Sequence, residues 1–562
     1  MKILLIHPYC TEERLTDDDI SVVPIGLFYI GAMLREEGHD VKILNWYCIN
    51  RTPEEIPSTI SKEKPDIMGF SILQANRWGG IEIARVAKKL DPRIKIVFGG
   101  VCATYLWRHF LTNFPEIDYV VLGEGEITFL NLVESLWSND SGSTGKIRGI
   151  AFRQRGKPIK NTAPEPVESI DELPNPARFF TYRHVVSSRG CPWNCTFCGS
   201  PGYWGRKVRF HSPRYFVDQL EMLRNRGVNL FFVSDDTFTL REQRVIEICR
   251  EIIERRLEIT WVAISRVNLV TERMLSWMRK AGCIQISYGV ESGSEKIRKI
   301  FNKQIKREEI RKAFRLTTRY GILPRAYFIY GAPGENDKTI QESIELIREI
   351  RPLSIIFYIL ALFPGTTLYT EFKKKFGISD DIWLNRMEDI MYFETDRNLT
   401  EDMVLNFGKR LREAFYEALP GFVESIRLVD DSEFDRLNSD FYSRLGMTFS
   451  HGDYSGIAAI KNRDEIAGRL FARAIHCHPD HRAYLGKGII HQKKGEFDRS
   501  IELLKEGLRY FPESKPLNIC LAVSYMNTGR FDQALSRLLP IKDDPEAASY
   551  IEACRRALED AE

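Results

Sequence analysis

The sequence predicts an α/β protein with two parallel-sheet domains followed by an all-α extension. Two series of short apolar runs alternate with amphipathic segments, and a polar, proline-rich segment separates them. A helical repeat with a period of 34 residues, from Gly495 to Gly529, closes the chain. The length of 562 residues exceeds what one hydrophobic core supports, so several domains are expected.

Residues 1–140 predict a parallel sheet with helices on both faces. The apolar runs are short and nearly continuous, and amphipathic segments such as Ile25–Gly38 and Ile81–Leu90 lie between them. The predicted strands are Lys2–Ile6, Val41–Leu44, Ile67–Ser71, Ile94–Gly99 and Tyr119–Leu122. The first run is too short for a signal peptide and is interpreted as a strand.

Glycines end or follow two of these strands, at Gly99, Gly100, Gly123 and Gly125. In an open parallel sheet, ligands bind beyond the carboxyl ends of the strands, and glycine there lets the backbone approach a bulky ligand. Glycine is also ordinary at a strand-to-helix turn. The four positions therefore indicate a ligand-binding edge without identifying the ligand.

Residues 141–180 are polar and contain five prolines, which predicts a linker with a small hairpin. Residues 181–420 form the second series, in which six strand signals alternate with helical patterns. These predicted strands are His184–Val186, Leu230–Val233, Thr260–Ala263, Ile284–Val290, Arg325–Tyr330 and Ser354–Leu360. In barrels built from such units, the chemistry belongs at the carboxyl ends of the strands.

Three cysteines, Cys191, Cys195 and Cys198, lie on the loop after the first strand of the second series. Their spacing rules out a disulfide framework among themselves, whereas soft thiolates at short spacing suit an iron–sulfur cluster or zinc. A closed zinc site needs a fourth protein ligand, and no His or Cys follows within the next ten residues. A cubane cluster held by three cysteines leaves one iron open to a small molecule. Three buried structural cysteines are the alternative.

The CxxxCxxC motif, with Arg189-Gly190 before it and Phe197 before its last cysteine, resembles the motif of the radical S-adenosylmethionine (SAM) enzymes. The resemblance implies a [4Fe–4S] cluster on the three cysteines and SAM bound to the open iron. It also implies reductive cleavage of SAM to a 5′-deoxyadenosyl radical. The expected fold of residues 181–420 is then an open (β/α)6 partial barrel, and the expected partner is an electron donor such as a flavodoxin or ferredoxin.

Four further residues are candidates for binding SAM. Asp235 and Asp236 follow the second strand, where the family has an acidic motif that meets the SAM amino group; a helix N-cap is the alternative. Arg266 follows the third strand and is expected to pair with the SAM carboxylate, with a surface arginine as the alternative. Glu291 ends the fourth strand in a stretch that resembles the family's ribose motif, with a helix-capping carboxylate as the alternative.

The first domain resembles the Rossmann-like cobalamin-binding domain that precedes the radical SAM barrel in one large subclass. The stretches Pro24–Leu27, Gly99–Thr104 and Gly123–Glu126 occur in the order of that subclass, which implies cobalamin as a cofactor. The chain departs from the subclass at two places. No Asp-x-His-x-x-Gly follows the first strand, so no histidine ligand to cobalt is predicted, and Val101-Cys102 stands where the subclass often has Pro-His.

Residues 421–465 are predicted to be a helical connector and residues 466–562 to be helical repeats. Gly495-Glu-Phe-Asp498 recurs as Gly529-Arg-Phe-Asp532, and this period is the tetratricopeptide (TPR) signature. Only about two repeats are present, so we expect earlier helices or the barrel to cap them. Helical repeats of this kind predict a protein or peptide partner.

Composition excludes several other classes. Lys and Arg total 80 against 77 for Asp and Glu, and the net charge of +3 indicates neither a nucleic-acid nor an anionic-membrane partner. The most apolar later stretch, Leu353–Phe363, has about half the length of a membrane span. Eleven scattered cysteines fit a reducing compartment, so a cytoplasmic location is predicted.

The leading functional prediction is a radical SAM enzyme that uses cobalamin to methylate a carbon of an unknown substrate. Ring formation or another rearrangement without methylation is one alternative. A methylthiotransferase-like enzyme is another, because Cys10, Cys48 and Cys102 lie near predicted strand ends and could hold a second cluster. The alternative outside enzymes is an interaction scaffold whose TPR helices act and whose cluster is structural.

Overall fold

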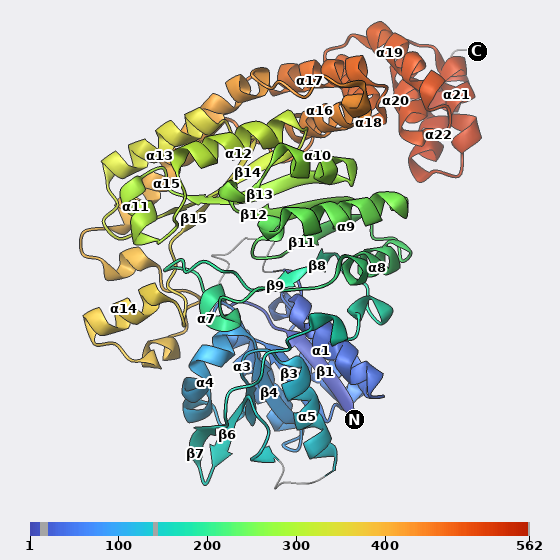
Figure 1. Ribbon diagram of the computed structural model, residues 1–562. Coiled ribbons are helices and arrows are strands. Elements are labelled where there is room, and N and C mark those ends of the chain that lie inside the picture. The colour runs from blue at the N-terminus through green and yellow to red at the C-terminus, as the bar shows by residue number, and fades with distance from the viewer. Residues whose placement is uncertain (12–20, 139–143, 560–562) are drawn as a thin grey trace.

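The computed structural model describes residues 1–11, 21–138 and 144–559, which form three parts (Figure 1). The N-terminal α/β domain lies at one end, the barrel lies in the middle, and the C-terminal helices extend from the far side of the barrel. The cysteine loop leads into the short helix α7 (Ser200–Trp204), which lies between the first two parts.

The first sheet contains five parallel strands and an antiparallel hairpin, in the order β2-β1-β3-β4-β5-β6-β7. The parallel strands are β1 (Lys2–His7), β2 (Asp40–Asn45), β3 (Ile67–Ser71), β4 (Lys95–Gly99) and β5 (Tyr119–Val121). All five predicted strands are confirmed, with ends that differ by at most one residue. The chain reverses its direction of winding between β1 and β3, the point at which sheets of this topology bind ligands.

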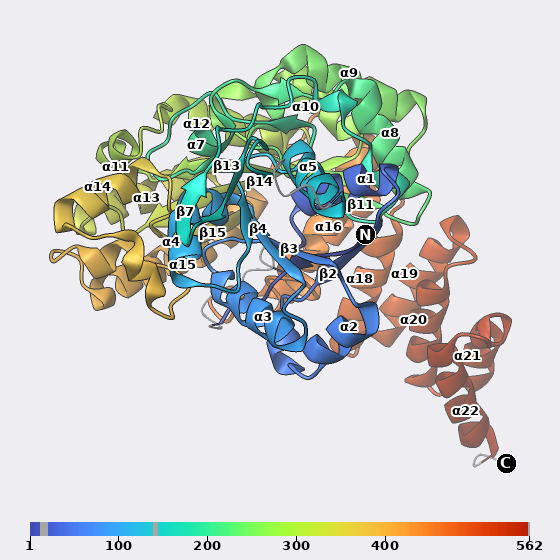
Figure 2. The same cartoon turned by 90° about the horizontal axis from the view of Figure 1, so that it is seen from below.

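Helices cover both faces of this sheet, as predicted (Figure 2). In β1, Ile3 and Leu5 share a core with α1 and α5, whereas Leu4 and Ile6 share a core with α2, α3 and α4. The alternation follows from the two-residue period of a strand that is buried on both sides. The helices are α1 (Ile25–Glu36), α2 (Glu55–Glu63), α3 (Arg77–Leu90), α4 (Val101–Asn113) and α5 (Glu126–Trp137).

The predicted hairpin is present as β6 (Ile150–Gln154) and β7 (Lys157–Lys160), but it is not part of a linker. β6 pairs with β5, so the first domain continues beyond the predicted boundary at residue 140. Arg153 explains the attachment, because its guanidinium donates to three carbonyl oxygens at and just beyond the end of α4, at 2.6–2.8 Å. These carbonyls belong to Leu111, Phe114 and Ile117.

The second sheet is an open barrel of six parallel strands in chain order, β8-β11-β12-β13-β14-β15, and the two end strands do not pair. The strands are β8 (His184–Val185), β11 (Leu230–Val233), β12 (Thr260–Ser265), β13 (Cys283–Glu291), β14 (Leu323–Tyr330) and β15 (Ser354–Ile359). The prediction of a (β/α)6 partial barrel is confirmed. A separate two-stranded sheet, β9 (Ser188–Arg189) with β10 (Arg209–Phe210), flanks the cysteine loop and α7.

Nine helices follow the barrel strands within the described residues. They are α7, α8 (Pro213–Arg224), α9 (Glu242–Glu254), α10 (Glu272–Lys280), α11 (Glu295–Ile300), α12 (Arg307–Arg319), α13 (Asp337–Ile350), α14 (Thr367–Phe376) and α15 (Glu401–Glu424). The segment after α14 wraps around the first domain. Buried Arg77, the first residue of α3, donates to backbone carbonyls of Glu388 and Met387 and stacks 4.7 Å from the Trp383 ring.

The remaining helices stack side by side away from the barrel. They are α16 (Asp435–Ser450), α17 (Arg463–Cys477), α18 (His481–Lys493), α19 (Phe497–Tyr510), α20 (Lys515–Met526), α21 (Phe531–Leu538) and α22 (Pro545–Glu559). Leu445, Leu470 and Ile490 belong to the same apolar core as the barrel. The expectation that earlier helices cap the repeats is therefore confirmed, because α16 and α17 pack directly against α18.

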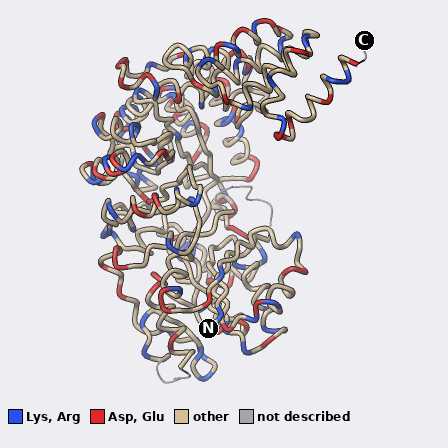
Figure 3. Tube along the Cα trace, turned by 90° about the vertical axis from the view of Figure 1, so that its right-hand side faces the viewer, with Lys and Arg blue, Asp and Glu red and all other residues tan. Residues whose placement is uncertain are grey.

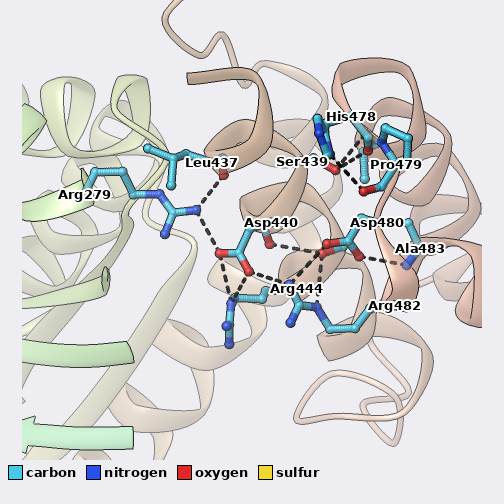
Figure 4. A network of polar contacts seen from close by, with 12 residues as sticks. Arg279, Leu437, Ser439, Asp440, Arg444, His478, Pro479, Asp480, Arg482 and Ala483 are labelled. Carbon is cyan, nitrogen blue, oxygen red and sulfur yellow. Dashed lines mark hydrogen bonds and ion pairs between the residues drawn. The ribbon is translucent and has the colours of Figure 1, made fainter. Parts of the chain in front are cut away.

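A partly buried ionic network joins the barrel to these helices (Figure 4). Asp440 of α16 accepts hydrogen bonds from Arg279 of α10 at 2.8 Å, from Arg444 at 2.9 Å and from Arg482 of α18. Although burial opposes ionisation, the three guanidiniums hold the pKa of the Asp440 carboxyl at about 2. One carboxylate thus fixes three successive structural layers to one another.

Charges are mixed along the whole described trace, with no long segment of a single sign (Figure 3). This distribution agrees with the near-neutral composition. Within residues 1–11, 21–138 and 144–559, no helix is both long and apolar enough to cross a membrane.

We predict that D440N loosens the contact between the barrel and the repeats. The change leaves three guanidiniums without their common carboxylate, so the free energy of opening α16 and α18, measured by hydrogen exchange, should fall by about 3 kcal/mol. The loss should also appear in the native protein as the pH falls below 3.8, the ordinary pKa of this carboxyl, towards 2.

The matched control is E424Q. Glu424 pairs with Arg469 at 3.0 Å between α15 and α17, but both side chains are more than half exposed. Loss of this exposed pair should lower the free energy of opening α16 and α18 by less than about 1 kcal/mol. Equal effects of the two substitutions would contradict the assigned importance of Asp440.

Candidate active site

The carboxyl ends of both sheets face each other, and the cysteine loop lies between them. The outer side of the loop is held by backbone hydrogen bonds on both flanks: Thr196 N donates to Phe301 O at 3.1 Å, and Leu368 N donates to Thr196 O at 3.0 Å. The Asn302 side chain also donates to Asn194 O at 2.8 Å. The loop is therefore anchored by the residues that follow α11 and by the start of α14.

The three motif cysteines are half-buried and close enough to influence one another. Burial raises the pKa of Cys198 to about 12, and the charges of Cys195 and Cys191 add to the increase. Burial likewise raises the pKa of Cys191, with Cys195 contributing. Within the described chain, no three His, Cys, Asp or Glu side chains are arranged to hold a single metal ion. Thiolates are the ligands that iron–sulfur clusters use.

Arg266 lies directly beside this loop rather than at the surface. Only 4% of the residue is exposed, and its guanidinium stacks 4.2 Å from the Trp193 ring. One terminal nitrogen lies 3.9 Å from Cys195 Sγ, and the other donates to Lys303 O at 2.6 Å. The alternative of a surface arginine is therefore wrong.

The two adjacent carboxylates after β11 have different environments. Asp235 is 1% exposed and accepts four hydrogen bonds, from the backbone and hydroxyl groups of Ser187 and Ser188. Asp236 accepts one hydrogen bond, from Ser200 Oγ at 2.6 Å, and retains solvent-accessible surface. The residue is exposed, but nearby protein atoms desolvate its carboxyl and, together with the charge of Asp235, raise its pKa. Asp236 is thus the carboxylate that is available to a ligand.

Glu291 is buried and forms an ion pair of 2.6 Å with the equally buried Lys303. A bulge in the pairing of β13 with β14 and a φ of +66° at Glu291 turn its side chain at the end of the strand. The pair lies over Gly289, where a Cβ atom would be 2.4 Å from Glu291 Oε1 and 2.6 Å from Lys303 Nζ. A side chain at position 289 would therefore displace this pair.

All four predicted glycines of the first domain line one cavity of about 100 Å³ at the carboxyl edge of its sheet. The cavity wall includes Gly26, Gly69, Gly99, Gly100, Gly123 and Gly125. Tyr203 and Trp204 of α7 close the cavity from the side of the cysteine loop, and the Tyr203 hydroxyl donates to Gly123 O at 2.6 Å. The edge of the first sheet and the motif loop thus form one site.

Packing explains why glycine occupies this cavity wall. A Cβ atom at Gly125 would lie 2.9 Å from Ile30 Cδ1, and one at Gly69 would lie 3.0 Å from Leu5 Cδ2. At Gly100, φ is +91° and a Cβ atom would lie 3.0 Å from Ile72 O. At Gly26, by contrast, a Cβ atom would meet no atom within 4 Å. The wall therefore leaves open space at residue 26, where a ligand can approach the backbone closely.

The Gly-Glu-Gly-Glu stretch has a second role that its sequence does not indicate. Glu126 accepts from Arg189 at 2.6 Å, and Glu124 accepts from both Arg189 and Arg209. All four side chains are at most 8% exposed. The Arg189 guanidinium also lies 5.0 Å from the ring of Tyr29 in α1. We name these four charges the junction clamp, because they join the first sheet to β9 and β10 on either side of the cysteine loop.

Cys10, Cys48 and Cys102 show no comparable convergence. Burial raises the pKa of Cys10 to about 12, and the charges of Glu388 and Asp389 add to the increase. Cys102 is 3% exposed and belongs to the apolar core beneath α4. Cys102 is therefore a core residue, whereas Cys10 and Cys48 are half-buried.

Comparison with known families accounts for all three parts of the chain. The radical SAM superfamily model matches residues 185–347, the B12 binding domain model matches residues 20–133, and a tetratricopeptide repeat model matches residues 492–554.

Two curated relatives match most of the chain. An uncharacterized methyltransferase of Pyrococcus horikoshii is 32% identical over 382 residues, which cover 66% of this chain and 82% of the relative. The anaerobic magnesium-protoporphyrin IX monomethyl ester cyclase of Rubrivivax gelatinosus is 28% identical over 441 residues, which cover 74% of this chain and 79% of the relative.

Solved structures show the same fold at lower identity. The radical SAM methyltransferase TsrM of Kitasatospora setae, with cobalamin and a [4Fe–4S] cluster bound, matches with a TM-score of 0.61 and 17% identity, covering 84% of this chain and 99% of TsrM. The cobalamin-dependent radical enzyme OxsB matches with a TM-score of 0.58 and 15% identity, covering 94% and 84%. The domain matches and the relative from Pyrococcus horikoshii show that the chain belongs to the cobalamin-binding class of radical SAM enzymes, whose cofactors are a [4Fe–4S] cluster, SAM and cobalamin.

Proposed function

We propose that this enzyme methylates an unactivated carbon of its substrate. The observation that carries the proposal is the shared site, in which the glycine-lined cavity of the cobalamin-type domain and the motif loop of the barrel meet through α7. When bound, the cluster and SAM supply the radical chemistry, and cobalamin supplies the methyl group. The methyltransferase relative from Pyrococcus horikoshii supports the same proposal.

The residues of this chain have distinct parts in this proposal. Cys191, Cys195 and Cys198 bind the cluster. Asp236 accepts hydrogen bonds from the SAM ammonium group, whereas Asp235 fixes the start of β9 through Ser187 and Ser188.

Glu291 accepts hydrogen bonds from the ribose hydroxyls of SAM. Lys303 pairs with the Glu291 carboxylate and keeps it in position. The facing sheet edges enclose the reacting groups and exclude water from them. These roles assign every polar group at the barrel mouth that the sequence analysis singled out, except Arg266.

Radical rearrangement without methylation is the second candidate, favoured by the match to the magnesium-protoporphyrin ester cyclase. SAM labelled with deuterium in its methyl group distinguishes the two once a substrate is found. Methylation carries the label into the product, whereas rearrangement leaves the product unlabelled. Membership in an enzyme family sets aside the interaction scaffold as the main function.

The enzyme needs a reductant, and we propose that a flavodoxin or ferredoxin is its electron donor. We also propose that the face formed by α18, α20 and α22 binds a protein or peptide, since alternate helices of such a stack line one surface. All eleven cysteines are free, which supports a reducing, cytoplasmic location.

We predict that C191A, C195A and C198A each lose the visible absorption of the cluster together with SAM cleavage. The native protein, reconstituted without oxygen, should contain about four irons, because three cysteines build one cubane. C477A, a half-buried cysteine of α17, is the control and should retain both properties. SAM cleavage by the single mutants would contradict the proposal, and about eight irons in the native protein would support the second-cluster alternative.

E291Q should weaken SAM binding while the cluster remains intact. Loss of a charge-assisted contact to the ribose should cost about 1.5–3 kcal/mol, which is a roughly ten- to hundredfold higher dissociation constant. E295Q is the control, because Glu295 lies four residues away in an exposed pair with Lys299. An unchanged dissociation constant in E291Q, with full iron content, would assign Glu291 to packing instead.

G26L should abolish cobalamin binding without destabilising the fold. The added side chain enters the free space at the cavity wall, and replacing glycine within a helix favours the helix by up to about 1 kcal/mol. The control is G468L in α17, where a Cβ atom also meets no atom within 4 Å. Cobalamin content and the midpoint of thermal unfolding test the prediction. Equal cobalamin content in G26L and the native protein would refute the assignment of this cavity.

A further inference from the structure

Arg266 is a buried cation whose described surroundings contain no carboxylate partner. Its guanidinium has one oxygen acceptor, Lys303 O at 2.6 Å, and otherwise faces the Trp193 ring and Cys195 Sγ. Its Nε–H group is buried and has no hydrogen-bond partner. Within the described residues, no Asp or Glu oxygen lies within ion-pair distance of it.

Several other buried arginines of this protein pair with carboxylates, although buried Arg298 is held instead by the backbone carbonyls of Ser292 and Gly293. Arg189 and Arg209 pair with the glutamates of the junction clamp, and Arg279 pairs with Asp440. Burying a charge without a counter-charge costs free energy. A guanidinium that is 4% exposed and has no carboxylate partner is therefore expected to lie beside an anion when the site is loaded. The atom nearest to Arg266 that acquires negative charge when the site is loaded is Cys195 Sγ.

We propose that Arg266 is the counter-charge of the iron–sulfur cluster and stabilises its reduced state. This inference rests on the proposed cluster ligation, but not on the methylation reaction. Three thiolates make the cluster anionic, and the electron that enters it adds a further negative charge. The attraction to a guanidinium fixed a few ångströms away grows with that charge, and the low exposure of Arg266 keeps water from screening it. Arg266 therefore raises the midpoint potential of the cluster.

The same side chain connects the cluster to the SAM-binding residues. Arg266 donates to the backbone carbonyl of Lys303, and the ammonium group of Lys303 holds Glu291. Stacking on Trp193 fixes the plane of the guanidinium between the cluster loop and the SAM-binding residues. Arg266 is thus placed to act on the potential of the cluster as well as on SAM, whose carboxylate could meet the unpartnered Nε–H group.

The test is a redox titration of the full chain with its cluster and cobalamin bound, without SAM or substrate. R266Q keeps a donor for Lys303 O but removes the charge. Its one-electron equilibrium should shift at least tenfold towards the oxidised cluster, which corresponds to a midpoint potential lower by 59 mV or more. R206Q is the matched control, because Arg206 donates to Pro192 O on the same loop at 3.0 Å but is exposed. Its potential should equal that of the native protein.

R266K separates charge from packing. This variant keeps the charge, so its midpoint potential should lie closer to that of the native protein than the midpoint potential of R266Q does. If R266Q fails to hold the cluster and R266K restores the iron content, the counter-charge is required for assembly, which supports the proposal.

Three outcomes would overturn it: an unchanged potential in R266Q with full iron content, equal potentials in R266Q and R266K, or loss of the cluster in both variants. A change in SAM affinity alone, with the potential unchanged, would limit Arg266 to the SAM carboxylate.

Discussion

The junction clamp is the interaction on which the rest of the site depends. Glu124 and Glu126 project from the edge of the first sheet, and the arginines that receive them flank the cysteine loop. Although burial opposes it, Glu126 and Glu124 hold the pKa of Arg189 above its ordinary value. Four buried charges are tolerated only with nearly complete pairing, so the clamp defines one relative position of the two domains. The glycine cavity and the motif loop share a site because of that position.

Apolar contacts complete this junction. The core on the α3 and α4 face of the first sheet continues into Ile297, Phe301 and Leu362 of the barrel, so the two domains share one interior. Buried ionic pairs specify the arrangement, whereas the continuous core supplies much of the cohesion. This division explains how a large cofactor site can lie at the junction without leaving the domains loosely connected.

Much of the fold could be predicted from the sequence because its signals are local. The strands follow from apolar runs with turn residues at their ends, and the cluster loop follows from three closely spaced cysteines. The roles of Asp235 and Asp236 could not be separated, because Ser187 and Ser188 are nearly 50 positions away in the chain. Lys303 and the arginines of the junction clamp were missed for the same reason, since only folding brings them to Glu291, Glu124 and Glu126. The sequence could not place the hairpin after residue 140 in the first domain, because a proline-rich composition does not indicate that β6 pairs with β5.

The shared interior of the barrel, α16, α17 and the start of the repeats has a consequence for how this protein comes apart. Ala467, Leu470 and Ala483 belong to the barrel core, whereas Leu504 and Leu517 belong to a separate core further out. Stacked repeats contact only their neighbours, so disruption should begin at the free end and advance inwards helix by helix. It should stop near α18, where further loss would expose the barrel itself. The chain therefore has a removable outer section and an inner section that is inseparable from the enzyme, and the dividing line lies inside the repeats instead of at residue 466.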